Sequence, residues 1–217
     1  MDLYTYQKKL CAFSFKAKEI NEPLIITQFL WGNNIITSAY PEDAFGEELF
    51  NIKAGRKARI PAAIATSQAI IQDFRMKNFK LLDEEFFPKS MGLKDLNTKE
   101  GYRGMGIGGE LFELTAQECF ERKLSRMFWT SLPDADKFYE EHGAEPYKKD
   151  IYMYTYTNMY GIERTDTYTS DYILDTSKPR TFASQPNPEF DKLIRDNLPK
   201  FNAENNITLS EYIHLTR

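Results

Sequence analysis

The sequence predicts an α/β (α+β) fold, because strand-like and helix-like segments alternate along residues 91–157. A strand at residues 91–98 leads into a glycine-rich turn, and a helix follows at residues 107–123. Residues 151–157 place tyrosines strictly at every second position, which is the period of a strand. Together these observations indicate a β-sheet with helices packed against it.

The predicted helix at residues 107–123 has a narrow polar face and a broad apolar face. Its polar residues form one narrow stripe: Glu110, Glu113, Gln117 and Glu121. Apolar residues fill most of the remaining circumference, which predicts a helix packed hard against a sheet. Glu118 and Arg122 interrupt this apolar arc at i, i+4 spacing, where they can pair with each other.

A strand at residues 126–130 follows, and then a short helix at residues 133–142. Pro133 suits the start of this helix and Gly143 its end. These segments complete an order of strand, turn, helix, strand and helix before the tyrosine-bearing strand.

The flanking regions are less regular. Strands are predicted at residues 10–15 and 24–30, a helix at residues 60–80, and a hairpin at residues 79–96 with its turn at Pro88. Residues 161–188 are rich in Thr, Asp, Ser and Pro without a sustained period, which predicts a linker or a surface-wrapping arm. Two more helices are predicted after it, at residues 188–198 and 210–215.

Composition limits the function classes. A chain of 217 residues fits one large domain, or a domain of about 150 residues with an extension. Hydrophobic residues make up 41% of it, enough for a real core, and a net charge of −4 argues against a dedicated nucleic-acid binder. No window approaches the roughly 18 apolar residues of a membrane span, so we expect a soluble, cytoplasmic protein.

The cysteines and histidines do not form a metal-binding or disulfide pattern. Cys11 and Cys119 lie far apart and are expected to be free thiols. His142 and His214 share no metal-ligand spacing with each other or with the cysteines, so no metal site is expected.

The residues that point to chemistry are the glycine-rich turn Tyr102–Gly109 between a strand and a helix. Glycines allow a tight turn and a close approach to a ligand, and the start of the following helix attracts anions such as a pyrophosphate. A P-loop is excluded because the turn has no Gly-Lys-Ser or Gly-Lys-Thr. A dinucleotide GxGxxG pattern fits Gly104, Gly106 and Gly109. Such a pattern should follow an apolar strand directly, however, and here residues 99–103 lie between the strand and the first glycine. The pattern R/Q-x-x-G-x-G/A fits Arg103, Gly106 and Gly108.

This last pattern resembles motif A of the GCN5-related N-acetyltransferase (GNAT) family. Residues 135–143, with an alanine, a Phe-Tyr pair and a closing glycine, are similar to a second recurring element of that family. The resemblance covers residues 91–157 and implies a central mixed, splayed β-sheet flanked by helices, with coenzyme A entering between two central parallel strands. It divides the chain into a GNAT-like domain at residues 1–160, whose acceptor-side part at residues 1–90 is atypical, and a C-terminal extension at residues 161–217.

The resemblance implies a set of coenzyme-binding residues. The strand end would run along the pantetheine arm, and the backbone amides of the turn would hold the pyrophosphate. The residues so implied are Leu96, Asn97, Thr98, Arg103, Gly104, Met105, Gly106, Ile107, Gly108 and Gly109. Met105 departs from the family, because many members carry a basic residue at this position of the turn.

The resemblance also implies catalytic groups. Tyr139 matches the tyrosine that can protonate the leaving thiolate, although its place on the apolar helix face fits a packing residue equally well. A base must also take a proton from the attacking amine. Asp95 and Glu100 are the nearest candidates, with Glu84 and Glu85 as further ones.

These observations predict an N-acetyltransferase that uses acetyl-CoA as cosubstrate and no metal, and that acts by direct transfer in a ternary complex. The expected partner is an amine acceptor, either a protein or a small molecule; nucleic acid and membrane are not expected, and a homodimer is compatible with the sequence. Two alternatives stay open: an inactive GNAT-fold protein that docks a partner through its C-terminal extension, and a nucleotide-binding module that uses the same loop.

Overall fold

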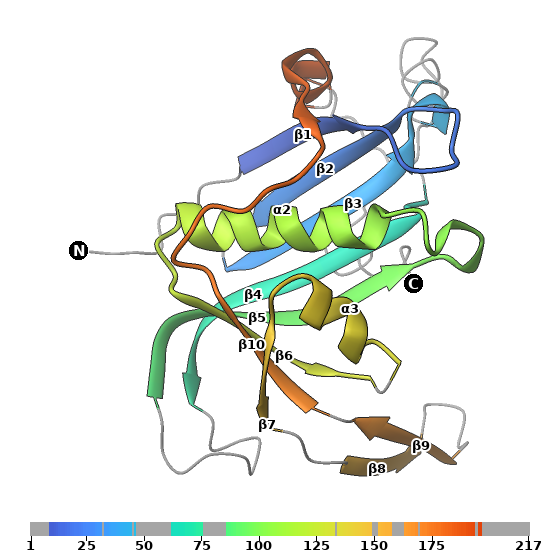
Figure 1. Ribbon diagram of the computed structural model, residues 1–217. Helices are drawn as coiled ribbons and strands as arrows, with labels where there is room; N and C mark the ends of the chain where they lie inside the picture. The colour runs from blue at the N-terminus through green and yellow to red at the C-terminus, as the bar shows by residue number, and fades with distance from the viewer. Residues whose placement is uncertain are drawn as a thin grey trace. The chain divides into compact units, whose positions relative to one another are not determined.

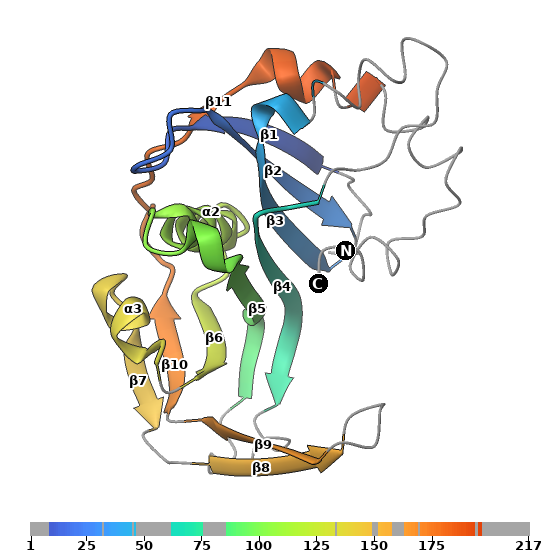
Figure 2. The ribbon, with the colours of Figure 1, turned by 90° about the vertical axis from the view of Figure 1, so that its right-hand side faces the viewer.

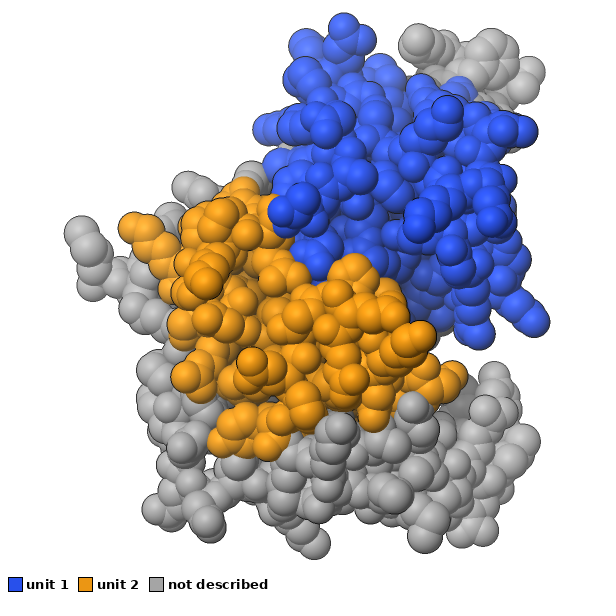
Figure 3. All heavy atoms as spheres, in the orientation of Figure 1, with its two compact units in different colours: residues 1–69, 95–115, 181–217 blue, residues 70–94, 116–180 orange. Residues whose placement is uncertain are grey.

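A computed structural model describes residues 9–31, 33–44, 46, 62–75, 86–132, 134–148, 152–157, 163–168, 170–193 and 195–196. The chain divides into two compact units, shown in Figure 3. Unit 1 comprises Met1–Ala69, Asp95–Thr115 and Thr181–Arg217, and unit 2 comprises Ile70–Lys94 and Ala116–Arg180. Each unit is described by itself below.

The described residues form a mixed sheet, a two-stranded sheet, the helix α2 (Ile107–Glu121) and shorter helices (Figure 1). The strands are β1 (Lys9–Phe15), β2 (Leu24–Trp31), β3 (Asn34–Pro41), β4 (Ala65–Arg75), β5 (Phe86–Thr98), β6 (Arg126–Ser131), β7 (Glu145–Lys148), β8 (Tyr152–Thr157), β9 (Glu163–Tyr168), β10 (Ser170–Asp175) and β11 (Gln185–Pro186). The helices are η2 (Glu100–Tyr102, 3-10), α2 (Ile107–Glu121) and α3 (Asp136–Glu141), and residues 42–44, 46, 188–193 and 195–196 are also helical.

Nine of these strands make one open sheet in the order β11-β1-β2-β3-β4-β5-β6-β10-β7, and β8 pairs with β9. This arrangement of a mixed sheet with flanking helices confirms the expected fold class. None of the helices in the described ranges is long and apolar enough to cross a membrane.

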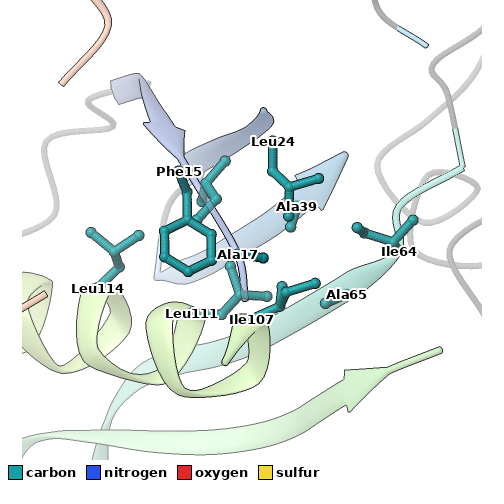
Figure 4. Close-up of a cluster of buried hydrophobic side chains, with 10 residues drawn as sticks. Phe15, Ala17, Leu24, Ala39, Ile64, Ala65, Ile107, Leu111 and Leu114 are labelled. Atoms are coloured by element: carbon teal, nitrogen blue, oxygen red, sulfur yellow. The ribbon is translucent and has the colours of Figure 1, made fainter. Parts of the chain in front are cut away.

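In unit 1, β1, β2 and β3 form an antiparallel meander with Phe15 opposite Leu24. The start of α2 packs against it through Ile107, Leu111 and Leu114, which point toward the strand side chains in Figure 4. All three are at most 2% exposed, as the broad apolar arc of the sequence predicts.

A buried polar network fixes how this part of α2 meets the strands. The Gln28 side-chain amide donates to the carbonyl oxygen of Leu114 at 3.1 Å. The Thr115 hydroxyl lies 2.9 Å from that of Ser67 and 3.4 Å from that of Thr37. Because a buried polar group without a partner is costly, this network disfavours other rotations of the helix.

In unit 2, β5 and β6 are parallel, with Met91 opposite Met127 and Gly92 opposite Phe128. β6 pairs antiparallel with β10 over its whole length, and β10 pairs with β7. At the end of α2, Glu118 and the following Arg122 form the expected ion pair at 2.7 Å.

Most predicted elements are confirmed. The predicted strands at residues 10–15, 24–30, 91–98 and 126–130 lie within β1, β2, β5 and β6, and the strand at residues 151–157 is β8. The predicted helix at residues 107–123 is α2. The short helix predicted at residues 133–142 is α3, which begins later than expected, and Gly143 follows it with a φ of 79°.

The helix predicted at residues 60–80 is wrong, because Ala65–Arg75 forms strand β4. Ala65, Thr66 and Ser67 are consecutive and all buried, so both faces of the strand are covered. Such a strand shows no alternation, and its apolar spacing resembles the period of a helix. The turn predicted at Pro88 is also wrong, since this residue lies inside β5. The other half of that hairpin falls largely outside the described residues.

The region predicted as a linker contains ordered strands. Two of these strands complete the sheet: β10 lies between β6 and β7, and β11 pairs with β1 (Figure 2). The helix predicted at residues 188–198 is present at residues 188–193 and 195–196, where the Asn187 side chain caps the amide of Phe190 at 2.9 Å. The helix predicted at residues 210–215 lies outside the described residues.

Candidate functional site

The segment that joins β5 to α2 forms a compact turn within unit 1. The amides of Tyr102 and Arg103 donate to the carbonyl oxygens of Lys99 and Glu100, at 2.9 and 3.3 Å, and so close η2. The helical ladder of α2 begins where the Glu110 amide donates to the carbonyl oxygen of Gly106 at 3.1 Å. The amides of residues 104–109, which lie between these hydrogen bonds, are therefore the ones that the turn presents to a ligand.

The structure explains why Arg103, Gly106 and Gly108 occupy the fixed positions of the R/Q-x-x-G-x-G/A pattern. Arg103 donates from Nε to the carbonyl oxygen of Thr98 at 3.1 Å and so ties the turn to the end of β5. Gly106 has a φ of 82°, which side-chain-bearing residues rarely adopt. A Cβ added to Gly108 would lie 3.2 Å from Oγ1 of Thr98, so the helix approaches the strand more closely than most residues allow.

The start of α2 has the properties of an anion site. The amides of Ile107, Gly108 and Gly109 belong to the first helical turn, where no helical carbonyl precedes them to accept a hydrogen bond. The positive end of the helix dipole adds to their attraction for an anion. Gly104, with a φ of 79°, bends the backbone just before this turn.

Met105 is an anchor of the turn. Its side chain is half-buried and packs against the hydrophobic cluster of unit 1, which includes Ile107. Its carbonyl oxygen accepts a hydrogen bond from the amide of Lys18 at 3.1 Å. The residue that departs from the family pattern therefore holds the turn against the protein core.

The other predicted residues of this region differ in exposure. Leu96 is half-buried and packs against the same cluster, Thr98 is half-buried, and Asn97 is exposed. Asp95 and Glu100, the candidate bases, are both exposed. Glu84 and Glu85 lie outside the described residues.

Tyr139, in unit 2, lies in an aromatic cluster and is only 8% exposed. Its ring centroid is 4.8 Å from that of Trp129, 5.0 Å from that of Phe138 and 5.8 Å from that of Tyr172. The Tyr172 hydroxyl donates to the Glu140 carboxylate at 3.1 Å. These contacts fix the Tyr139 ring, which both a packing residue and a positioned acid require.

The two cysteines are free thiols, as the sequence predicts. Burial raises the pKa of the Cys119 thiol to about 12, and the negative charge of Glu118 acts in the same direction, while a hydrogen bond with Thr176 opposes both. A thiol that stays protonated is a weak nucleophile, so Cys119 is not suited to form an acetyl-cysteine intermediate. The described residues contain no His, Cys, Asp and Glu group of three or more that could hold a metal ion.

The sequence did not identify the residues that hold the C-terminal segment to α2. In unit 1, the Glu110 carboxylate accepts hydrogen bonds from the amides of Ala183 and Ser184, at 3.1 and 2.7 Å. In unit 2, the Gln117 side chain accepts one from the amide of Arg180 at 2.8 Å. Both acceptors belong to the polar stripe of α2, which in sequence looks like an ordinary solvent-facing stripe. No sequence signal identifies their backbone partners.

The Arg180 side chain makes a further contact in unit 2. Its Nη2 donates to the carbonyl oxygen of His142 at 2.7 Å, at the C-terminal end of α3. A cation at this end of a helix is favourable because the last carbonyls carry partial negative charge. Arg180 therefore stabilises the helix that carries Tyr139.

The family model that matches the chain agrees with the sequence motif. Residues 69–144 match the family model described as acetyltransferase (GNAT) family. No curated protein matches the chain. Among solved structures, an acetyltransferase of the GNAT family from Staphylococcus aureus Mu50 is similar at 14% identity and a TM-score of 0.40, over 66% of this chain and 68% of that chain.

Two other similar structures contain ligands. Arabidopsis thaliana NAA60, in complex with a bisubstrate analogue, has 14% identity and a TM-score of 0.45, over 66% of this chain and 76% of that chain. A GNAT family acetyltransferase from Elizabethkingia anophelis, with acetyl-CoA bound, has 14% identity and a TM-score of 0.40 over the same shares of the two chains.

Proposed function

We propose that this protein transfers an acetyl group from acetyl-CoA to an amine, since residues 69–144 match the model of the GNAT acetyltransferase family. The observation that carries the proposal is the turn between β5 and α2. There a left-handed Gly106, a close Gly108–Thr98 approach and the Arg103–Thr98 hydrogen bond together present unpaired helix-start amides to an anion.

The pyrophosphate of the coenzyme would bind the amides from Gly104 to Gly109. The amide of Arg103 already donates to Glu100 and is not available for this role. The terminal guanidinium nitrogens of Arg103 form no hydrogen bond with the described residues, so its charge can still attract the phosphates. The pantetheine arm would run along Leu96, Asn97 and Thr98, at the end of β5.

The chemistry would be direct transfer in a ternary complex. The neutral amine attacks the thioester carbonyl carbon, the new C–N bond forms, and the C–S bond breaks as the tetrahedral intermediate collapses. The amine loses a proton to a base, for which Asp95 and Glu100 are the candidates, and the departing coenzyme A thiolate gains one from an acid, for which Tyr139 is the candidate. The buried, protonated Cys119 supports this route over an acetyl-cysteine at that residue.

The test is calorimetric titration of the purified chain with acetyl-CoA, followed by a screen of protein and small-molecule amines for release of free coenzyme A thiol. Arg103→Glu should abolish binding, since it reverses the charge beside the phosphates and cannot donate to Thr98. The control is Lys123→Glu, the same charge change at an exposed position after the far end of α2. Equal binding by the two variants, or no binding by the folded wild-type chain, would reject the proposal.

A further inference from the structure

The C-terminal segment at residues 181–187, here called the strap, is fastened to unit 1 at several points. Gln185 and Pro186 pair with β1, and the amide of Asn187 donates to the carbonyl oxygen of Ala12 at 2.8 Å. The Phe182 ring packs edge-on against Phe13, with centroids 6.4 Å apart. The strap is therefore an integral part of this unit.

The strap meets α2 at Glu110. The two carboxylate oxygens each accept one backbone amide, Oε2 from Ala183 at 3.1 Å and Oε1 from Ser184 at 2.7 Å. Glu110 is only 7% exposed, so the strap supplies partners to a carboxylate that water reaches poorly. Glu110 also lies in the first turn of α2, directly after Gly109.

This position makes Glu110 a competitor for the coenzyme when the strap is absent. The start of a helix attracts anions, and a carboxylate in its first turn can accept hydrogen bonds from the same amides that would hold the pyrophosphate. A free carboxylate there would also repel the phosphates. With both oxygens bound to the strap, the carboxylate is held in place and its charge is partly offset.

We propose that the strap and the coenzyme bind cooperatively through Glu110, which makes Glu110 a positioning residue for the acetyl-CoA site. The inference rests on the proposed function, since it concerns the same site. Coupling of two binding events is reciprocal: strap docking strengthens coenzyme binding, and the coenzyme strengthens strap docking by the same factor.

The first test removes one strap donor without changing α2. Ala183→Pro has no amide proton to donate, and Ala183 is exposed, so the ring does not enter the core. Ala183→Ser keeps the amide and is the matched control. We expect Ala183→Pro to raise the Kd for acetyl-CoA by about fivefold to tenfold. Ala183→Ser should bind like the wild type. Equal Kd values for the two folded variants would overturn the coupling.

The second test asks whether the effect passes through Glu110. In a Glu110→Gln background the charge is gone, so Ala183→Pro should change the Kd by less than about twofold. A strap that only stabilises the fold would give the same factor in both backgrounds, which would reject the role of Glu110. Each variant's thermal unfolding confirms that it is folded under the binding conditions.

The third test uses the reciprocity. Saturating acetyl-CoA should slow hydrogen exchange of the Ala183 and Ser184 amides in the wild-type protein, and should do so much less in Glu110→Gln. If the wild type binds acetyl-CoA but exchange at these amides does not change, the coupling fails while the proposed function stands. If the folded wild type binds no acetyl-CoA, both fail.

Discussion

Arg103 and Gly108 meet the same residue from two sides. The Arg103 Nε donates to the carbonyl oxygen of Thr98 at 3.1 Å, and the backbone of Gly108 lies so close that a Cβ there would be 3.2 Å from Oγ1 of Thr98. Thr98 is the last residue of β5, and Gly108 is the second residue of α2. The strand end and the helix start are thus held together at one residue, on the turn proposed to bind the coenzyme.

The contact between Gly108 and Thr98 should be visible as a coupling between two substitutions. Gly108→Ala gains about 1 kcal/mol of helix propensity. It also forces its new Cβ against the Thr98 hydroxyl. In a Thr98→Ala background this crowding is absent, so Gly108→Ala should then stabilise the protein by about 0.5–1 kcal/mol more than in the wild type. Urea unfolding of the four proteins measures the difference, and strictly additive effects would contradict it.

A side chain at position 106 should destabilise the protein. Its φ of 82° is in the left-handed region, which costs a residue with a Cβ about 1–2 kcal/mol. We expect Gly106→Ala to lower the free energy of unfolding by that amount. Gly101→Ala is the control, because Gly101 has neither a positive φ nor an atom within 4 Å of an added Cβ. It should change the free energy of unfolding by less than about 0.5 kcal/mol. Equal losses would show that the backbone conformation is not the cause.

Tyr139→Phe separates the two roles of the tyrosine. The variant keeps the ring and its packing against Trp129 but loses the hydroxyl. If the hydroxyl protonates the leaving thiolate, kcat should fall by about 100-fold or more while the Kd for acetyl-CoA is unchanged. Tyr172→Phe removes a hydroxyl from the same aromatic cluster, one that donates to Glu140, and should keep its kcat. A wild-type kcat in Tyr139→Phe would leave only the packing role.

The raised pKa of the Cys119 thiol predicts that the stability of the protein depends on pH. Its pKa is about 12 in the folded protein and 9.0 for an ordinary thiol, so above pH 9 the unfolded chain releases a proton that the folded chain keeps. The stability contributed by the buried neutral thiol is complete below pH 9. It falls between pH 9 and 12 by up to about 1.4 kcal/mol per pH unit. Denaturant unfolding at several pH values should show this slope in the wild type and a smaller one in Cys119→Ala.

Reactivity gives a second measurement of the same thiol. Cys119 is buried, whereas Cys11 is only half-buried. In the folded protein near pH 8, an alkylating reagent should label Cys11 first and Cys119 only after unfolding. Rapid labelling of Cys119 in the folded protein would contradict the raised pKa.

The C-terminal segment bears on the alternative of a partner-docking arm. Residues 170–187, which composition marked as linker-like, form β10, β11 and the strap, and several of their backbone amides are bound by Glu110, Gln117 and β1. Most of this segment is polar in sequence, but Tyr172 and Leu174 of β10 are buried at 0% and 1% exposure, and backbone hydrogen bonds pair β10 with β6 and β7. Residues 170–187, so bound to the rest of the chain, are therefore not a free docking arm.

The sequence by itself determined the local geometry of the candidate site. Glycine at positions 104 and 106 permits the left-handed turn, and the periodic apolar residues of α2 require a helix that covers a sheet. These features depend on the conformational preferences of single residues and on short-range periodicity, so they can be deduced without knowing what lies nearby. The resemblance to an acetyltransferase rested on these same residues.

Only the tertiary structure decided the rest. Strand β4 has the apolar spacing of a helix and is a strand because both of its faces are covered at Ala65, Thr66 and Ser67. Glu110 belongs to a polar stripe. It is buried where the strap lies against it, and the amide of Ala183, 73 residues away in sequence, donates a hydrogen bond to its carboxylate. Burial and hydrogen-bond partners at such separations depend on which segments pack together, and no local pattern of side chains records that choice.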